Sequence, residues 1–167
     1  MTDREEILRT PRLRLTTWLP SDLDDLAALH ADAEVMRHMT TGPQTRAATR
    51  ERLETFIAEH RRRGWSKWRV EGASGFLGRA GFGLAHGSGH REVGYLLVRA
   101  AWGSGLATEL TQALRQWHDD HPEPALVPEL RAYVLPGNEA SCRVLEKAGF
   151  RAVGEEDGQL VFASGRP

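Results

Sequence analysis

The chain of 167 residues lacks several features that mark particular classes of protein. Its one cysteine, Cys142, excludes an internal disulfide framework and a zinc site built from cysteines alone. No apolar run approaches the roughly 18 residues of a membrane-spanning helix. Residues 1–6 are mostly charged and lack the apolar stretch of a secretory signal peptide. We therefore expect a cytoplasmic protein without a membrane partner.

Neither sign of charge is in excess. The sequence has 22 Lys and Arg against 23 Asp and Glu, a formal net charge of −1. A dedicated nucleic-acid-binding domain usually carries a basic excess, so we expect no nucleic-acid partner. A chain of this length buries about 70% of the surface that its unfolded form exposes, which is enough for one domain. We expect that domain to span residues 1–167.

The distribution of apolar residues predicts a mixed α/β domain. Helical spacing and caps predict a first helix capped by Ser21, and further helices near residues 45–63, 105–118 and 139–148. Asp157-Gly158 is a strong turn signal for a final hairpin. Alternating or dense apolar residues predict strands at 12–16, 66–70, 76–84, 92–98, 130–135, 150–154 and 159–162.

Two glycines stand where an apolar strand leads through a short loop into a helix. Gly103 and Gly105 have no side chain to block close approach to the backbone, and a helix start offers free N–H groups to phosphate or pyrophosphate. The segment is not a P-loop, because no Gly-Lys-Ser/Thr follows. It is not a Rossmann fingerprint either, because Thr108 stands where the third glycine would be. On these glycines alone, a tight packing turn is an equal interpretation.

A second segment, N-E-A-S-C-R-V-L-E-K-A-G-F at residues 138–150, makes the interpretation specific. Together the two segments resemble the acetyl-CoA-binding core of the GNAT superfamily of N-acetyltransferases. Residues 102–107 are similar to its pyrophosphate loop, Gln/Arg-x-x-Gly-x-Gly/Ala, and residues 138–150 to its N-x-x-S…V-L-E-K-x-G-F helix. E-V-G-Y at 92–95 and T-P-R-L-R-L at 10–15 resemble the branch that contains the ribosomal-protein N-terminal acetyltransferases. The resemblance covers residues 8–162.

The resemblance implies an α/β (α+β) fold with about four helices and a mixed, mostly antiparallel sheet of six to seven strands. That sheet is splayed between its fourth and fifth strands, here residues 92–98 and 130–135, and acetyl-CoA enters the opening. Backbone groups of Leu96, Leu97 and Val98 would bind the pantetheine as an added strand would. Asn138 and Ser141 would meet its amide and the CoA sulfur. The implied pyrophosphate-binding residues are Trp102, Gly103, Ser104, Gly105, Leu106, Ala107 and Thr108.

The same resemblance implies direct attack of an amine on the thioester. Glu92 is our candidate base, directly or through water, because the attacking amine must be neutral. Its alternative role is to orient the substrate or to pair with an arginine such as Arg91. Ser141 is the candidate proton donor to the departing sulfur, or else an ordinary helix serine. Asn138 is expected to cap its helix, and Tyr133 is a reserve acid or a packing residue.

Three positions depart from the family pattern. Trp102 stands where many members have Gln or Arg, Tyr133 where some have a glutamate base, and Leu145 where some have a tyrosine acid. The final hairpin is also shorter than in relatives that act on ribosomal proteins. The acceptor therefore stays open among a peptide N-terminus, a free amino acid, a polyamine and an aminoglycoside-like amine. We expect no metal, and the sequence leaves a homodimer open.

Two other functions are kept as alternatives. The missing glutamate and tyrosine motivate a non-catalytic CoA-binding or regulatory module of the same fold. The glycine turn alone motivates, more weakly, an enzyme that binds nucleotide phosphates.

Other conspicuous side chains carry less. Cys142 is more typical of a small buried residue than of an acyl relay. H-D-D-H at 118–121 is more typical of a solvated helix end than of a metal site. His86 and His90 flank a glycine loop that either borders the acceptor site or is a plain turn. Trp65 and Trp68 line either the acceptor pocket or the core.

Overall fold

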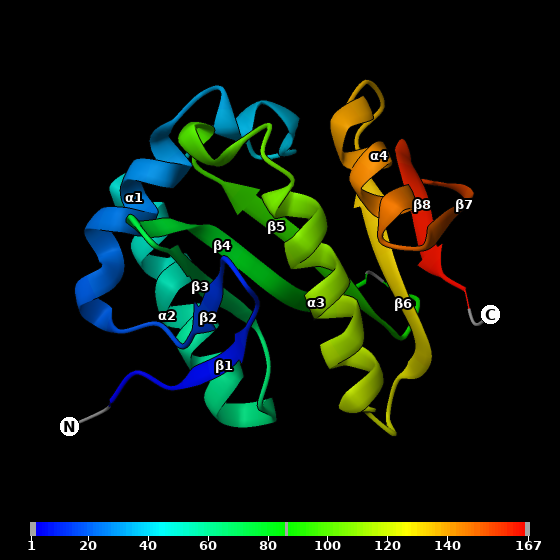
Figure 1. Cartoon of the computed structure of the whole chain (residues 1–167), viewed down its shortest axis with the longest axis horizontal. Helices are drawn as coiled ribbons and strands as arrows, with labels where there is room; N and C mark the ends of the chain where they lie inside the picture. Colours follow the sequence, from blue (N-terminus) through cyan, green and yellow to red (C-terminus); the bar gives the residue numbers. More distant parts are fainter. Residues whose placement is uncertain (1–2, 86, 166–167) are drawn as a thin grey trace.

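The computed structural model describes residues 3–85 and 87–165, and these form one mixed sheet with helices on both faces (Figure 1). The sheet has eight strands in the order β1-β2-β3-β4-β5-β6-β8-β7. The β5–β6 pair is parallel and the other neighbours are antiparallel. The strands are β1 Glu6–Arg9, β2 Arg14–Thr16, β3 Lys67–Gly72, β4 Gly75–Leu84, β5 His90–Leu97, β6 Val127–Val134, β7 Phe150–Glu156 and β8 Gln159–Ser164.

This architecture confirms the expected fold class, with one strand more than the six or seven expected. The additional strand, β1, has four residues and lies at the edge of the sheet beside β2. The final hairpin is confirmed as well. Asp157 and Gly158 join β7 to β8 with φ of 49° and 77°, the positive angles that tight hairpin turns require.

The four α-helices of the described chain form two layers (Figure 1). Thr45 caps the second of them, accepting the Ala48 N–H at 3.2 Å, and Gly64 ends it in the left-handed conformation. Ser21 does not cap the first helix. It lies inside a short 3-10 turn, where the carboxylate of Asp22 accepts the Leu19 N–H at 2.8 Å instead. The helices are α1 Leu23–Ala31, α2 Arg46–Arg63, α3 Leu106–Asp120 and α4 Glu139–Lys147.

Two apolar cores hold the helices against opposite faces of the sheet. Burial of apolar side chains on each face is the main force that fixes the layers. Trp65 and Trp68 are 3% and 0% exposed, so both belong to the core. The α1/α2 face is packed by Trp18, Leu26, Leu29, Leu53, Phe56 and Leu96, and the α3/α4 face by Trp68, Phe82, Leu110, Leu114, Leu130 and Leu145.

Strands β5 and β6 diverge after their first residues. Their register pairs are His90 with Val127 and Glu92 with Arg131. From Arg131 onward β6 pairs with β8, and among the described strands residues 93–97 of β5 have a partner only in β4. We call residues 93–97 the open edge of β5. It lies where the splay was expected. Strand β1 was not among the predicted strands, so the fourth and fifth predicted strands correspond to β5 and β6.

Candidate active site

Hydrogen bonds determine which backbone groups of β5 face the open edge. The Val98 N–H donates to the Leu77 carbonyl of the β4 strand at 2.8 Å. The antiparallel register continues from there without a shift, so even-numbered residues of β5 exchange hydrogen bonds with β4. The backbone groups of Tyr95 and Leu97 therefore point across the open edge, whereas those of Leu96 and Val98 are directed at β4.

The side chains of β5 alternate between the two helical layers. Val93, Tyr95 and Leu97 pack with the α3/α4 core, whereas Leu96 packs with the α1/α2 core. Because successive side chains of a strand point to opposite faces, Glu92 shares the α1/α2 face with Leu96. The open edge thus separates two different chemical environments.

The loop before α3 presents backbone amides to solvent. Gly103 and Gly105 have φ of +78° and +81°, and a Cβ at Gly103 would meet no atom within 4 Å. No side chain caps the start of α3, so no side-chain acceptor competes for the amides of Leu106, Ala107 and Thr108 in its first turn. These amides also lie at the positive end of the helix dipole. This exposed loop, which also contains Ser104, fits a pyrophosphate.

Two contacts that the sequence analysis missed fix this loop. The Arg12 guanidinium donates to Glu109 Oε1 at 2.8 Å from Nε and to the Ser104 carbonyl at 2.8 Å from Nη1. Thr10 also donates its hydroxyl to Glu109. The T-P-R segment is therefore hydrogen-bonded to the first turn of α3. The signal was present in the motif at 10–15, but its partner lies 97 residues away.

Trp102 has a structural role beside the same loop. Its indole Nε1 donates to the Leu97 carbonyl at 2.9 Å, while the ring is half exposed. This bond ties the loop to the open edge and uses one backbone acceptor of Leu97. The Leu97 N–H and both backbone groups of Tyr95 remain directed across the edge.

Ser141 lies on the α3/α4 side of the open edge. Asn138 caps α4, as expected, because its side-chain oxygen accepts the Ser141 N–H at 3.3 Å. The Ser141 hydroxyl is 3.1 Å from the Tyr95 hydroxyl, so α4 is linked to the middle of β5. Burial raises the pKa of Tyr95, which keeps the phenol protonated and able to donate. The sequence analysis quoted Tyr95 within a motif without assigning it a role.

Glu92 lies on the opposite face of β5 and retains some accessible surface. The alternative that it pairs with Arg91 does not fit, because the Arg91 guanidinium is buried on the other face, 2.9 Å from His118 Nδ1. Arg91 also lies over the rings of Trp65, Phe82 and Trp117. Glu92 is instead the carboxylate with the largest stabilising effect on the Lys67 ammonium.

Tyr133 is placed apart from Ser141. Its hydroxyl donates to Glu156 Oε2 of β7 at 3.0 Å. Its β6 neighbours Ala132 and Val134 pack in the α3/α4 core, so the Tyr133 side chain points to the face opposite α4. If Tyr133 acts as a reserve acid, it would therefore donate its proton on the same face of the sheet as Glu92.

The α1/α2 face contains a buried polar cluster. Arg79 is 3% exposed, and its Nε donates to His30 Nε2 at 2.9 Å. His30 Nδ1 in turn is 3.1 Å from the Thr49 hydroxyl. Burial, with smaller contributions from Arg79 and Arg52, lowers the pKa of His30 to about 3. His30 is thus neutral, and its Nε2 accepts the hydrogen bond from Arg79.

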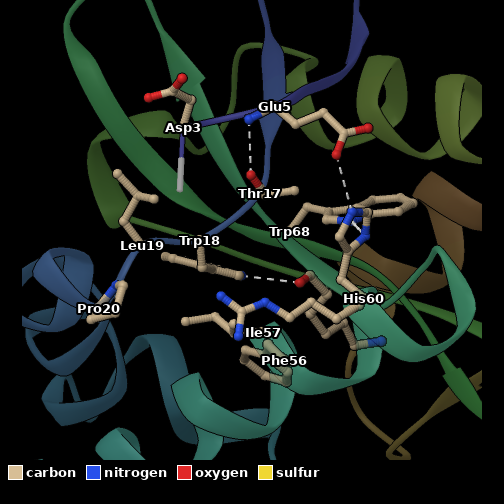
Figure 2. A pocket seen from close by; sticks show the side chains of 12 residues that line it. Asp3, Glu5, Thr17, Trp18, Leu19, Pro20, Phe56, Ile57, His60 and Trp68 are labelled. Atoms are coloured by element: carbon tan, nitrogen blue, oxygen red, sulfur yellow. Dashed lines mark hydrogen bonds and ion pairs between the residues drawn. The ribbon is translucent and has the colours of Figure 1, made fainter. Parts of the chain in front are cut away.

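A cavity of about 150 Å³ lies between α2 and the beginning of β3 (Figure 2). Trp18, Phe56, His60 and Lys67 are among its walls, and none of residues 93–97 lines it. The indole of Trp18 donates to the Lys67 carbonyl at 3.0 Å. The cavity therefore belongs to the α1/α2 face rather than to the open edge.

The contacts of the other conspicuous side chains fit a role in packing rather than in chemistry. Cys142 is half-buried against the α3/α4 core, and burial raises the pKa of its thiol, which disfavours a nucleophilic thiolate. His118 Nε2 contacts the Pro128 carbonyl at 2.7 Å. His90 is buried, and His86 lies outside the described residues. In the described chain no group of three or more His, Cys, Asp or Glu could hold a metal ion.

Residues 12–151 match the family model described as an acetyltransferase (GNAT) domain. The chain belongs to the GNAT acetyltransferases. This GNAT chain is 27% identical over 166 residues to the uncharacterized N-acetyltransferase YoaA of Bacillus subtilis, covering 96% of this chain and 91% of YoaA. It is therefore an acetyltransferase enzyme. Among its described helices, none has the length and apolar composition needed to cross a bilayer.

Solved GNAT structures share the fold. An acetyltransferase from Agrobacterium tumefaciens superposes with a TM-score of 0.80 at 24% identity, covering 99% of this chain and 96% of that one. RimL, a ribosomal L7/L12 acetyltransferase in complex with coenzyme A, gives 0.77 at 18% identity, covering 95% and 97%. Spermidine N-acetyltransferase from Vibrio cholerae, with CoA and spermine, gives 0.70 at 17%, covering 92% and 94%.

Proposed function

We propose that this GNAT enzyme transfers the acetyl group of acetyl-CoA to a primary amine by direct attack within a ternary complex. The observation that carries the proposal is the arrangement around the open edge of β5. Glu92 lies on its α1/α2 face, and the Tyr95–Ser141 pair lies on its α3/α4 face, joined by a 3.1 Å contact. Solved relatives contain CoA, and one contains an amine substrate.

Each half of the arrangement has a separate task. The amides of Leu106 to Thr108 and the glycine loop bind the pyrophosphate, and the outward backbone groups of Tyr95 and Leu97 pair with the pantetheine. A backbone N–H at the open edge polarises the thioester carbonyl, which is an oxyanion-hole role. Acetyl-CoA supplies the activated acetyl group.

Two side chains then move protons. Glu92, directly or through water, takes the proton from the attacking amine on the α1/α2 face. Ser141, whose hydroxyl is oriented by Tyr95, donates a proton to the departing sulfur on the other face and regains one from water.

The first test separates this function from the two alternatives. Acetyl-CoA at about 100 times its Kd should raise the melting temperature by about 5–10 °C, because it binds only the folded chain. CoA release is then measured against a panel of primary amines. Release with any of them supports the transferase. Binding without release across the panel would favour the non-catalytic module, and a larger stabilisation by ATP than by CoA would favour a nucleotide-phosphate enzyme.

A further inference from the structure

Lys67 reaches across the sheet toward the open edge of β5. It pairs with Gly81 of β4, and Gly81 pairs with Gly94 of β5. Because both partners are glycines, no side chain blocks the path of the lysine over the α1/α2 face. A Cβ added at Gly94 would lie 3.1 Å from Lys67 Nζ. The ammonium therefore sits over the middle of β5, and Glu92 is two residues, about 7 Å, along the same face.

No carboxylate of the described residues forms an ion pair with the Lys67 ammonium, although Glu92 stabilises its charge from farther along the same face. Within the described chain, Lys67 Nζ has one hydrogen bond, to the Gly81 carbonyl at 3.4 Å, and no ion pair within 4.0 Å. Arg79 is bonded to neutral His30, and its buried Nη2 has no partner among the described residues. Arg52 from α2 lies close enough to disfavour the charge on both.

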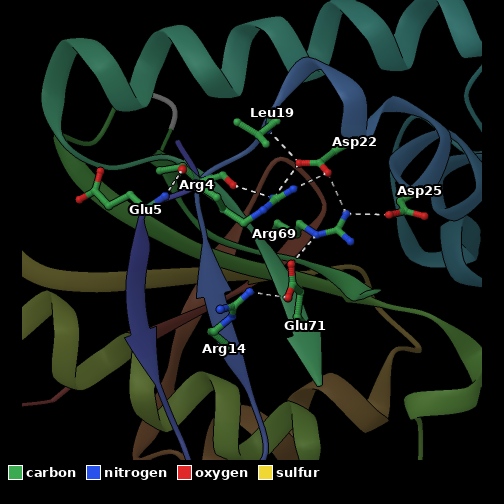
Figure 3. Close-up of polar contacts among 9 residues, drawn as sticks. Arg4, Glu5, Arg14, Leu19, Asp22, Asp25, Arg69 and Glu71 are labelled. Atoms are coloured by element: carbon green, nitrogen blue, oxygen red, sulfur yellow. Dashed lines mark hydrogen bonds and ion pairs between the residues drawn. The ribbon is translucent and has the colours of Figure 1, made fainter. Parts of the chain in front are cut away.

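A neighbouring arginine shows what full pairing looks like in this protein (Figure 3). Arg69, on the same strand as Lys67, lies 2.7 Å from Asp25, 2.8 Å from Glu71 and 3.4 Å from Asp22. Ion pairs therefore do form on this face, at Arg69, two residues along β3 from Lys67. The missing ion-pair partner beside Lys67 and Arg79 is therefore specific to that part of the face.

The second carboxylate that acts on Lys67, Glu59, is already bound by other side chains. Glu59 is held by the Ser66 hydroxyl at 2.8 Å and by Arg63 at 3.4 Å. Burial lowers the pKa of Lys67 to about 8, Glu92 opposes that shift, and Arg79 and Arg52 add to it. Lys67 nevertheless keeps accessible surface. A desolvated cation on a side chain that is only partly buried gains most from an anionic ligand.

We propose that the acceptor is a primary amine that also carries a carboxylate, with the carboxylate bound at Lys67 and the amine placed at Glu92. The proposal rests on the transferase function above and narrows its substrate. Arg52 and Arg79 contribute to the same positive field. A small zwitterion of the amino-acid type satisfies both ends of the site. Spermine and aminoglycosides bring several positive charges to a face that already has an excess of them.

The experiment compares matched acceptors. Rates of CoA release are measured for amino acids, for their methyl esters, for the corresponding decarboxylated amines and for spermine. We expect the carboxylate form to exceed its ester and its decarboxylated amine in kcat/KM by about 10–100-fold, as for a hydrogen bond between charged groups. Lys67→Met should reduce that preference to within about 3-fold while leaving acetyl-CoA affinity unchanged, and Lys67→Arg should restore most of it. Lys147→Met, at the exposed end of α4, is the matched control.

Binding measurements separate this proposal from the proposed function. Calorimetry of the CoA-bound enzyme with the same acceptors shows whether carboxylates bind through Lys67 when no turnover occurs. Carboxylate binding that Lys67→Met abolishes, without CoA release, would remove the transferase and keep Lys67 as the carboxylate-binding site. Efficient acetylation of esters or spermine, indifferent to Lys67→Met, would remove the acceptor class and keep the transferase. If no carboxylate-bearing amine binds or reacts, the acceptor class is also wrong.

Discussion

The two faces of β5 are built on different principles. On the α3/α4 side, Tyr95 and Leu97 pack into an apolar core, and the groups that we propose to bind acetyl-CoA are backbone amides, glycines and one hydroxyl. On the α1/α2 side, the sheet carries Glu92, Lys67 and the buried Arg79–His30 pair. The first face suits a ligand common to a whole family, and the second suits one particular acceptor.

This difference follows from what each ligand demands. A pyrophosphate and an extended pantetheine can be bound by main-chain groups, which every residue has. An acceptor amine must be recognised by its own charges and deprotonated at one point, and only side chains can do that. Relatives can therefore share the α3/α4 face and differ on the other.

The largest expected effect comes from the base. Glu92→Gln should lower kcat by about 10²–10⁴-fold, the range of a positioned proton acceptor, and leave acetyl-CoA affinity nearly unchanged. The loss should shrink as the pH rises, because more of the amine is then already neutral. Steady-state kinetics between pH 7 and 10, with calorimetry for acetyl-CoA, measure both quantities.

The exposed Glu54→Gln on α2 is the control for this change. A Glu92→Gln enzyme with normal kcat at neutral pH would show that the proton leaves by another route. The α1/α2 face would then bind the acceptor without removing its proton, and Glu92 would only orient the substrate.

The next effect belongs to the other face. Ser141→Ala should lower kcat by about 10–100-fold, because a donor to a developing negative charge is removed. This loss should not be recovered at high pH. Tyr95→Phe should cost about 2–10-fold, since it removes only the hydrogen bond that orients Ser141. Single-turnover rates test the pair, and a larger loss for Tyr95→Phe than for Ser141→Ala would make Tyr95 rather than Ser141 the donor.

The two faces also differ in how far sequence reasoning reached. The α3/α4 face was predictable because its signals are local: the glycine loop before α3, Asn138 as a cap and Ser141 three residues later. Glu92 was proposed as the base through its place on a recognisable strand, and that role stays a prediction. Strand β1 was missed because it has only four residues, too few to show an alternating pattern.

The charged contacts were out of reach for a physical reason. Lys67 meets Gly94 only because β3, β4 and β5 align in one register. The Arg79–His30 bond spans 49 residues, and the Tyr95–Ser141 contact spans 46. No periodicity in the sequence encodes such pairings, which become visible only in the assembled sheet.

Acid should destabilise the protein through the α1/α2 face. His30 has a pKa of about 3 in the folded chain and about 6.5 when unfolded. The unfolded chain therefore binds the additional proton between these values. Its contribution to stability is complete above pH 6.5 and is lost as the pH falls toward 3. Between pH 7 and pH 5 the loss should be about 2 kcal/mol, measured by urea unfolding at each pH.

His30→Gln is the informative variant. It should be less stable than the parent at pH 7, because it weakens the contact with Arg79, but should lose less stability on acidification by about the same 2 kcal/mol. His118, whose pKa burial also lowers, contributes in the same direction in both proteins and so cancels in the difference. Equal pH dependence in the two proteins would place the acid sensitivity on the α3/α4 face instead.

The smallest effect tests the clamp on the CoA side. Arg12 is 46% exposed where it meets Glu109, so its ion pair contributes at most about 1 kcal/mol. Arg12→Met should therefore raise the Kd for CoA by no more than about 5-fold, with little change in melting temperature. The matched control is Arg9→Met, which breaks a similar exposed pair with Glu6 on β1, away from the loop. Combining Arg12→Met with Glu109→Gln should give little more than either change alone, because each variant already frees the first turn of α3. Additive losses in that double-mutant cycle would mean that Arg12 contacts the ligand itself, and the α3/α4 face would then also recognise its ligand through a charged side chain.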